Sequence, residues 1–381
     1  MRYSCIEVHY GELWLRGRNR PRFIDTLIGN IAKALEGEKC SIENIGDRLA
    51  IMLNKGADIE SIKAKLGHVF GISWYASSLI VENDIDKIIE GVKHIVKESS
   101  RTAFKVQANR SYKRVSFNSI DIVSAMLREK SSMGFLMDKK ASSVIYVSVT
   151  RKGTFIHVGK EQGLGGLPVG VSGRAVVLIS GGIDSPVAAF MAMKRGLEPI
   201  YLHIHPFPNN MEAKSSKIGS IVKLLDRYHP AQIYYAPYFI FQSYLLRAEG
   251  CARYENVVFK RFMLRLAEKI ALRENANAIV TGESIGQVSS QTIENMLASS
   301  YGIKKLVVRP LIGFDKNEII ECAKGIGTYE LSIQKYKDVC SINVRNPKTK
   351  VKPEVIESIY SRASLERAED ETLKRSLLAS Y

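Results

Sequence analysis

Residues 180–185, SGGIDS, follow the apolar run AVVLI at residues 175–179 without a spacer. The adjacent glycines Gly181 and Gly182 let the backbone turn sharply, so that successive N–H groups point into one concavity. Pro186 suits the first turn of a following helix, and Asp184 or Ser185 can cap that helix. A glycine turn that leads into a helix N-terminus is typical of an anion site. Residues 180–185, called the phosphate loop below, therefore predict binding of a phosphate or pyrophosphate.

The phosphate loop matches neither of two common nucleotide-binding patterns. It lacks the lysine of G-x-x-x-x-G-K-[ST], and its glycines do not have the G-x-G-x-x-G spacing. A capped strand-to-helix turn without a ligand is the alternative for a bare SGG sequence. The presence of Asp184 and Ser185 favours the anion site over that alternative.

The residues around the phosphate loop indicate the fold that positions it. From residue 174 onward, strand-like apolar runs alternate with helical stretches, which predicts right-handed βαβ units and a parallel sheet with helices on both faces. Ligands bind such sheets at the carboxyl ends of the strands, and the phosphate loop follows such an end. We expect strands at 175–179, 198–205, 231–238, 278–284 and 304–312, and helices at 186–196, 214–228, 256–275 and 316–327.

The first 160 residues have a different pattern and divide into two segments. We expect a small α+β unit at 1–57 and a second segment at 58–160. Residues 161–173 are expected to be a linker, because GLGGLPVGVSG within them contains five glycines and a proline. In the two segments we expect strands at 5–10, 48–53 and 104–110, a strand pair within 142–159, and helices at 22–37, 59–72, 85–99 and 119–133.

The composition favours a polyanionic partner. The chain has 55 lysines and arginines against 39 acidic residues, a formal charge of +16. A lysine-rich surface that only keeps the chain in solution is the alternative. Five cysteines without a C-x-x-C pair argue against a zinc site or a disulfide framework. The sequence shows neither a signal peptide nor a membrane-spanning run, so we expect a cytoplasmic protein without membrane contact.

Five stretches carry a resemblance to a known family: VHYGELWLRGRNRPRF, GGLPVGVSGRAVVLISGGIDSPVAAFMAMKRG, KRFMLRLAEKIA, IVTGESIGQVSSQTIENM and RPLIGFDKNEIIECAKGIGTYELSI. Together they resemble the tRNA 4-thiouridine synthetases, also called tRNA sulfurtransferases. TGESIGQVSSQT combined with the N-terminal YGEL is specific to that family. The resemblance implies an N-terminal ferredoxin-like domain (1–57), a THUMP RNA-binding domain (58–160) and a C-terminal ATP pyrophosphatase domain with a parallel sheet, of the adenine nucleotide alpha hydrolase type (174–381).

The resemblance also implies a reaction, in which ATP adenylates O4 of uridine 8 in tRNA and sulfur then displaces AMP to give 4-thiouridine. The phosphate loop would supply donors to the phosphates, and Asp184 would act in catalysis and help to hold Mg²⁺, which proteins commonly bind through a carboxylate and phosphate oxygens. The residues expected to bind ATP are Leu178, Ile179, Ser180, Gly181, Gly182, Asp184, Ser185, His203, Ile204, Lys260, Gly282 and Gln291. A histidine that only packs within its strand is the alternative for the side chain of His203.

Sulfur transfer is expected at Cys340, which matches the family cysteine that works with a persulfide donor. Arg345 and Lys348 follow it, and nearby cations favour a thiolate. An inert, half-buried cysteine is the alternative. The chain ends without the rhodanese domain of many bacterial members, so we expect the sulfur to come from a cysteine desulfurase persulfide or from sulfide. Cys251 and Cys322 are possible second thiols, although the spacing around Cys322 favours core packing.

Binding of tRNA is expected at the basic stretch RTAFKVQANRSYKR, through Lys105, Arg110, Lys113 and Arg114. Phe104, set in an alternating strand, is expected in the core and not in base stacking. A homodimer is possible. Two alternatives to the thiolation reaction remain: another adenylating enzyme with the same phosphate loop, either an amidating synthetase or a different tRNA thiolase, and a tRNA-binding protein without catalytic activity.

Overall fold

The computed structural model describes residues 3–97, 101–129, 133–339 and 347–381. The chain folds into two compact units, unit 1 (residues 1–168) and unit 2 (residues 169–381). The division lies within the segment 161–173 that the sequence marks as a linker.

The first part of unit 1 is a βαββαβ arrangement, in which an antiparallel sheet has the strand order β2-β3-β1-β4. This is the ferredoxin-like topology, as the sequence predicts. Helix α1 forms because its apolar residues Ile24, Leu27 and Ile31 recur at helical spacing and are buried. The elements are β1 (Cys5–Tyr10), the 3-10 helix η1 (Glu12–Asn19), α1 (Arg20–Ala34), β2 (Cys40–Asn44), β3 (Leu49–Leu53), α2 (Ile59–Leu66) and β4 (Ile72–Val81).

The expected boundary at residue 57 cuts through this βαββαβ arrangement. Helix α2 begins after residue 57, where the Asp58 side chain accepts a hydrogen bond from Ser61 N. Strand β4 then pairs with β1 along its length, and its last residues, Leu79 to Val81, pair with β8. One strand therefore belongs to both parts of unit 1, and a boundary between them does not fall before α2.

The second part of unit 1 extends the sheet from β4 in the order β8-β7-β5-β6. Strands β7 and β8 form the expected antiparallel pair, and β5 lies parallel to β7. Phe104 on β5 is fully buried in the core that α3 and α4 share, so its expected packing role is confirmed. The elements are α3 (Ile85–Lys97), β5 (Ala103–Arg110), α4 (Ser119–Arg128), β6 (Leu136–Met137), β7 (Val144–Val149), β8 (Thr154–Val158) and β9 (Glu161–Gln162).

The expected linker 161–173 is hydrogen-bonded along much of its length. Its start belongs to unit 1, because β9 pairs with β4 and Gly165 N donates to Ile72 O at 2.8 Å. Its end belongs to unit 2, because Gly170 N and Ser172 N both donate to Gly196 O. The glycines of this segment therefore adopt specific turns against the two units.

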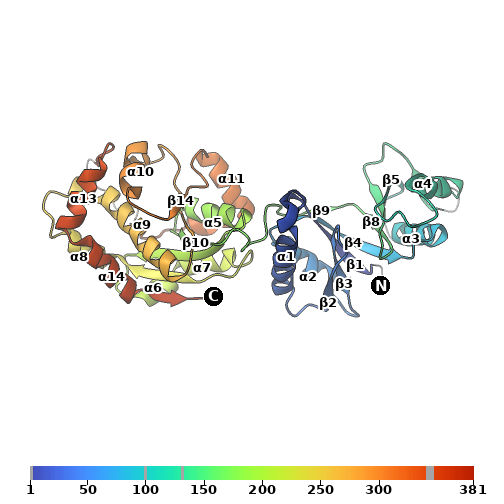
Figure 1. Cartoon of the computed structure of the whole chain (residues 1–381), viewed down its shortest axis with the longest axis horizontal. Helices are drawn as coiled ribbons and strands as arrows, with labels where there is room; N and C mark the ends of the chain where they lie inside the picture. Colours follow the sequence, from blue (N-terminus) through green and yellow to red (C-terminus); the bar gives the residue numbers. More distant parts are fainter. Residues whose placement is uncertain (1–2, 98–100, 130–132, 340–346) are drawn as a thin grey trace. The chain divides into compact units, whose positions relative to one another are not determined.

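Unit 2 contains a six-stranded sheet in the order β14-β13-β10-β11-β12-β15, in which the first five strands are parallel and β15 is antiparallel. Figure 1 labels its strands β10 and β14. The expected parallel sheet is thus confirmed, whereas α13, α14 and β15 have no counterpart among the expected elements. The strands are β10 (Arg174–Leu178), β11 (Glu198–His205), β12 (Ile233–Pro237), β13 (Ala278–Val280), β14 (Leu306–Val308) and β15 (Leu377–Ala379).

Helices cover both faces of this sheet. Val176 and Leu202 belong to the same apolar core as buried residues of α8, α9, α13 and α14. Val177 and Tyr201 alternate with them along the strands and point to the opposite face, where α5 packs on β11 and β13. The helices are α5 (Asp184–Lys194), α6 (Asn210–Lys214), α7 (Lys217–Leu225), α8 (Tyr238–Leu245), η3 (Ala252–Tyr254), α9 (Glu255–Arg273), η4 (Ser289–Gln291), α10 (Ile293–Ser300), α11 (Lys316–Ile326), α12 (Tyr329–Ser332), α13 (Pro353–Arg362) and α14 (Leu365–Arg375).

Candidate functional site

The phosphate loop connects the carboxyl end of β10 to the N-terminus of α5, as the sequence predicts. The loop closes on itself: Ser180 N donates to Ser185 Oγ at 2.8 Å, and the two serine hydroxyls lie 3.0 Å apart. The N-cap of α5 is Ile183, and no side chain caps the helix. The expected capping by Asp184 or Ser185 is therefore wrong, because both residues are already inside the first helical turn and Ser185 Oγ serves the loop instead.

Two glycines of the site are required by close packing. A Cβ atom at Gly181 would lie 2.7 Å from Lys217 Cε and 2.8 Å from the Tyr336 ring. A Cβ atom at Gly282, which follows β13, would lie 2.9 Å from Ser185 Cα. A side chain at residue 282 would displace the backbone at Asp184 and Ser185, and one at residue 181 would displace the Lys217 and Tyr336 side chains.

A cavity of about 1080 Å³ opens beside the phosphate loop at the carboxyl ends of the parallel strands. Strands β13 and β14 are shorter than expected, and Thr281, Gly282 and Glu283 leave the sheet to line the cavity. Every residue that the sequence leads us to expect in ATP binding lines it: Leu178, Ile179, Ser180, Gly181, Gly182, Asp184, Ser185, His203, Ile204, Lys260, Gly282 and Gln291.

A lysine from a distant part of the chain lies at the phosphate loop. Lys316 Nζ, at the start of α11, is 2.6 Å from Asp184 Oδ1. With its amide turned to donate to Asp184 Oδ2 and to accept from Lys316 Nζ, Gln287 bridges this pair. The loop itself has no lysine, and Lys316 is not among the residues that the sequence predicts at the site. The capping box of Asp315 and Glu318, which fixes the start of α11, is the sequence signal that could have drawn attention to it.

A second charged cluster lies at the cavity wall, around the buried carboxylate of Glu283. Lys260 Nζ lies 2.6 Å and Arg309 Nε 2.9 Å from the two oxygens of this group. Burial alone would raise the pKa of Glu283, but Lys260 and Arg309 outweigh burial and hold that pKa below its usual range. Glu283 thus stays ionised and orients Lys260, the one member of this cluster that the sequence predicts at the site.

The imidazole of His203, near the end of β11, is buried at one side of the cavity. Its Nδ1 lies 2.9 Å from Ile179 O and therefore donates, while its Nε2 accepts from the Tyr336 hydroxyl at 2.8 Å. Burial lowers the pKa of His203 to about 4, even though Asp338 opposes this change. The His203 side chain is therefore neutral near pH 7, and each of its two ring nitrogens makes a hydrogen bond. It is packed within the protein and also lines the cavity.

Of the candidate thiols that the structure describes, neither Cys251 nor Cys322 lines the cavity. Cys340 and Arg345 lie outside the described residues. Cys251 is buried, and burial raises the pKa of its thiol. Cys322 is half-buried on α11 and is not among the residues that line the cavity. In the ranges that the structure describes, no group of three or more His, Cys, Asp or Glu side chains could hold a metal ion.

The basic residues expected to bind tRNA differ in their surroundings. Lys105 is exposed, in agreement with the alternation of β5, and Lys113 and Arg114, which follow β5, are exposed as well. Arg110 is half-buried, and its Nη1 donates to Phe117 O at 2.7 Å. Arg110 therefore holds the chain between β5 and α4.

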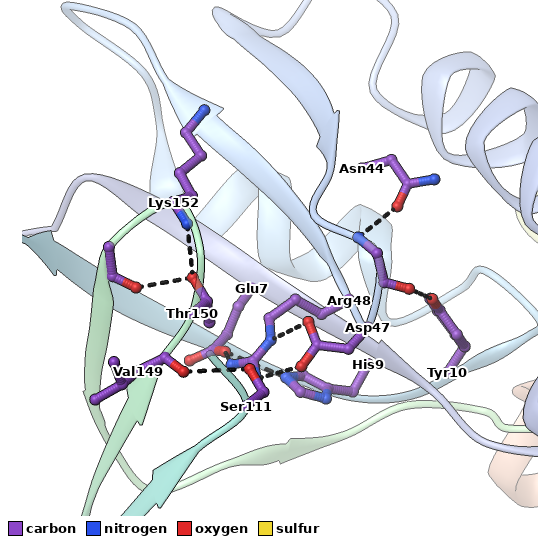
Figure 2. A network of polar contacts seen from close by, with 12 residues as sticks. Glu7, His9, Tyr10, Asn44, Asp47, Arg48, Ser111, Val149, Thr150 and Lys152 are labelled. Atoms are coloured by element: carbon purple, nitrogen blue, oxygen red, sulfur yellow. Dashed lines mark hydrogen bonds and ion pairs between the residues drawn. The ribbon is translucent and has the colours of Figure 1, made fainter. Parts of the chain in front are cut away.

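A buried polar network that the sequence does not predict joins the strands of unit 1 (Figure 2). Glu7, fully buried on β1, accepts hydrogen bonds from Arg48 Nη1 at 2.8 Å and Ser78 Oγ at 2.6 Å. His9 and His157 each lie 3.2 Å from its carboxylate. Burial alone would raise the pKa of Glu7, but these neighbours lower it to about 2. The network ties β1, β4 and β8 together.

An exposed cation lies over aromatic rings near this network. Lys160 Nζ is 4.1 Å from the ring centres of both Trp74 and Tyr146. The Tyr146 ring stacks on His157, and the Trp74 ring stacks on His9. The buried carboxylate is thus covered by two histidines and two aromatic rings.

Comparisons with known proteins agree with this architecture. The family model of the ThiI ferredoxin-like domain matches residues 5–76, and that of the thiamine biosynthesis protein (ThiI) matches residues 170–365. A probable tRNA sulfurtransferase of Moorella thermoacetica is 37% identical over 91% of this chain and 90% of its own length. Its counterpart in Bacillus licheniformis is 36% identical, with 99% of this chain and 95% of the relative covered.

Solved structures show the same likeness. A 4-thiouridine synthetase, solved as an RNA complex with bound ATP, superposes with a TM-score of 0.87, 31% identity and 99% coverage of both chains. PH1313 from Pyrococcus horikoshii shares the fold, with a TM-score of 0.63 and 21% identity over 85% of this chain and 99% of its own. Every helix in the described ranges is too short or too polar to span a bilayer.

Proposed function

The chain belongs to the tRNA sulfurtransferase family and is a transferase, and we propose that it converts uridine 8 of tRNA to 4-thiouridine at the expense of ATP. The observation that carries this proposal is the cavity of unit 2, where the phosphate loop, Lys316 and the expected ATP-binding residues face one space. The resemblance to a synthetase solved with RNA and ATP supports it.

In the first proposed step, O4 of the uridine attacks the α-phosphorus of ATP, the bond to the β-phosphate oxygen breaks and pyrophosphate leaves. The negative charge of the departing pyrophosphate needs fixed donors and a cation. The N–H groups and hydroxyls of the phosphate loop supply the donors, and Lys316 supplies a positive charge beside them. The adenylated oxygen then leaves readily as part of AMP.

The remaining cavity residues hold the rest of the nucleotide in this proposal. Leu178, Ile179 and Ile204 pack around the adenine at the ends of β10 and β11. Lys260, held by Glu283, presents a cation to the nucleotide. Because Gln291 lines the same wall, its amide is available for a specific hydrogen bond.

The site could bind Mg²⁺ through the single carboxylate of Asp184, with the other ligands supplied by phosphate oxygens and water. Asp184 is the acidic side chain within the phosphate loop, and Mg²⁺ is commonly held by one or two carboxylates together with substrate phosphates and water. Asp184 would hold the ion on the phosphate oxygens, with Lys316 released from its ion pair. When bound, the ion would neutralise charge on the phosphates.

In the second proposed step, a sulfur nucleophile bonds to C4 of the base, the C4–O bond breaks and AMP leaves. We propose that Cys340 accepts the outer sulfur of a cysteine desulfurase persulfide, a role that rests on its sequence context alone. The outer sulfur of the Cys340 persulfide bonds to C4 as AMP leaves, and a thiol reductant then attacks Cys340 Sγ, which breaks the S–S bond, releases 4-thiouridine and leaves a disulfide on Cys340. Sulfide needs no such thiol. Cys340→Ser should therefore lose thiolation from the protein persulfide but keep it from sulfide, and equal activity with both donors would exclude the role.

Unit 1 is proposed to bind the tRNA, with the ferredoxin-like part and the THUMP part sharing β4. The exposed Lys105, Lys113 and Arg114 would pair with phosphates, which gives shape-directed and salt-sensitive affinity. We propose that the protein works in the cytoplasm, where its tRNA substrate is present.

The decisive experiment is nucleoside mass spectrometry of tRNA after incubation with the protein, ATP, Mg²⁺ and sulfide. The expected product is 4-thiouridine at position 8, formed only when ATP is present. A tRNA in which uridine 8 is replaced by cytidine is the matched control and should gain no sulfur. Absence of 4-thiouridine, or sulfur at another position, would contradict the proposal.

A further inference from the structure

A short segment after α12 lies directly against the phosphate loop. Residues 332–338, called the contact segment below, connect the end of α12 to the residues before 340. Ser332, Gln334, Tyr336 and Asp338 of this segment line the same cavity as the phosphate loop. The segment follows the loop by about 150 residues in sequence, so tertiary contacts alone hold the two together.

Two side chains anchor the contact segment. Lys217 Nζ, at the start of α7, donates to Ser332 O at 2.9 Å and to Gln334 O at 2.7 Å. The Tyr336 hydroxyl donates to His203 Nε2, and its ring packs where a Cβ atom of residue 181 would otherwise be. The absence of a side chain at Gly181 is therefore what lets the segment approach.

The carboxylate of Asp338 accepts the hydrogen bond that a phosphate would need. Gly181 N donates to Asp338 Oδ2 at 2.8 Å. Gly181 is the first glycine of the phosphate loop, whose N–H groups are proposed to bind the phosphates of ATP. A phosphate at that position and the carboxylate at its present one cannot both use this donor, and their like charges repel.

We propose that Asp338 is a positioning residue that competes with the phosphates of ATP for Gly181 N–H. The proposal rests on the function proposed above and deepens it. Before ATP binds, Asp338 keeps the phosphate loop in its anion-binding shape. When ATP enters, its phosphates displace Asp338, and when pyrophosphate leaves, the carboxylate returns to the same donor.

This competition predicts that the protein binds both ATP and pyrophosphate more weakly than it would without Asp338. A ligand that binds only when Asp338 is displaced binds with an apparent affinity reduced by the fraction of loops that are open. Both ATP and pyrophosphate are therefore held more weakly than the loop alone would hold them. Weaker binding of pyrophosphate favours its departure and opposes reversal of the adenylation step.

The test is calorimetric titration of the full chain with inorganic pyrophosphate and, separately, with ATP, both with Mg²⁺ and without tRNA. Asp338→Ala should bind pyrophosphate about tenfold more tightly than wild type, since hydrogen bonds to charged groups are worth a factor of ten or more. In a separate thiolation assay with tRNA and sulfide, the KM of Asp338→Ala for ATP should fall and its inhibition by pyrophosphate should strengthen, whereas its kcat should not rise. Glu330→Gln, which removes an exposed acid of α12, should bind both ligands as wild type does.

Unchanged or weaker binding by Asp338→Ala would overturn the proposal, and weaker binding would instead make Asp338 a ligand of the bound nucleotide. Asp338→Asn, which keeps the side-chain shape without the charge, should also bind more tightly and serves if the alanine variant folds poorly. If wild type binds neither ATP nor pyrophosphate, the proposed function fails together with this inference. If wild type binds both and the variants bind no more tightly, only this inference fails.

Hydrogen exchange gives a second readout that an unrelated structural role of Asp338 would not produce. Pyrophosphate should accelerate amide exchange in peptides that cover residues 332–338 of the wild-type protein, because the bond between Gly181 N and Asp338 no longer restrains the end of the segment, while its anchors at Lys217 and His203 remain. The same peptides of Asp338→Ala should exchange at the faster rate already without pyrophosphate. Unchanged exchange in the wild type on addition of pyrophosphate would overturn the proposal.

Discussion

Lys316 Nζ lies 2.6 Å from Asp184 Oδ1 although 132 residues separate them in the chain. The pair joins the first turn of α5 to the first turn of α11, so two helix N-termini meet at the phosphate loop. Each residue balances the charge of the other until an anion or a cation takes over that role. The two residues therefore form an ion pair at the site that we propose for the phosphates of ATP.

Removing one member of this pair should stop the activation step without affecting tRNA binding. We expect Asp184→Ala to reduce ATP–pyrophosphate exchange by at least about 100-fold, because without the carboxylate the site would lose the Mg²⁺ that is proposed to neutralise the charge developing on the phosphates. Lys316→Met should have a similar effect, and Lys316→Arg should retain part of the activity because it keeps the charge. Filter binding of tRNA should stay unchanged in all three variants, and near-normal exchange by Asp184→Ala would contradict its assigned role.

The buried cluster of Glu283, Lys260 and Arg309 should contribute to the stability of the fold. Glu283→Gln leaves Lys260 and Arg309 without a counter-charge in a buried position, so we expect a loss of about 3 kcal/mol in the free energy of unfolding. Urea unfolding followed by circular dichroism at pH 7 measures this loss. Glu321→Gln, in the exposed pair with Lys324, should leave the urea midpoint unchanged.

The sign of the pH dependence of the Glu283 variant follows from the lowered pKa of Glu283. A carboxyl with a lowered pKa in the folded state stabilises the fold above its ordinary pKa and loses this effect as the pH falls. The difference between wild type and Glu283→Gln should therefore shrink below about pH 4. A difference that is independent of pH would show that the charge of Glu283 is not what stabilises the site.

The Glu7 network predicts acid sensitivity of unit 1. The pKa of Glu7 is lowered from 4.5 to about 2, so its ionised form stabilises the fold above pH 4.5, and this stabilisation is lost between pH 4.5 and 2. At pH 7 the contribution is roughly 3 kcal/mol relative to Glu7→Gln. Both tryptophans of the chain, Trp14 and Trp74, belong to unit 1, so tryptophan fluorescence during urea unfolding reports this unit alone.

The acid-sensitivity prediction is contradicted if Glu7→Gln has no effect on the stability of unit 1. If wild type and Glu7→Gln unfold at the same urea concentration at pH 7, the ionised carboxylate contributes nothing to unit 1. Glu36→Gln, an exposed acid beyond the end of α1, is the matched control and should behave as wild type at every pH.

The exposed basic residues of unit 1 should contribute to tRNA binding through charge. We expect Lys105→Glu combined with Lys113→Glu to weaken tRNA binding and to reduce the slope of log affinity against log salt by about one for each phosphate that is no longer neutralised. Lys33→Glu, an exposed lysine on α1, tests whether any loss of charge has the same effect. An unchanged salt slope in the double variant would place the RNA surface elsewhere. Arg110 is a poor choice for this test, because replacing it would also break its bond to Phe117 O.

Local sequence determined the parts of this protein whose interactions are local. The turn Ser180-Gly181-Gly182 and the apolar run before it specify a strand, a loop and a helix within a few residues, so the phosphate loop could be predicted. The same holds for α1 and β5, because side-chain periodicity decides which face is buried. Resemblance to a family then added Lys260, Gly282 and Gln291, which no local rule connects to the loop.

Tertiary structure decided the contacts between residues that lie far apart in the chain. Glu283 and Lys316 reach the cavity because parallel strands bring their carboxyl ends to one edge, and Asp338 reaches it because Lys217 and Tyr336 anchor its segment there. No spacing rule shows which of these distant charges meet. The boundary at residue 57 was misplaced for the same reason, since the pairing of β4 with β1 is a long-range hydrogen-bond pattern. Capping by Asp184 or Ser185 was wrong because the helix begins at Asp184, and the exact start of a helix depends on the loop that it closes.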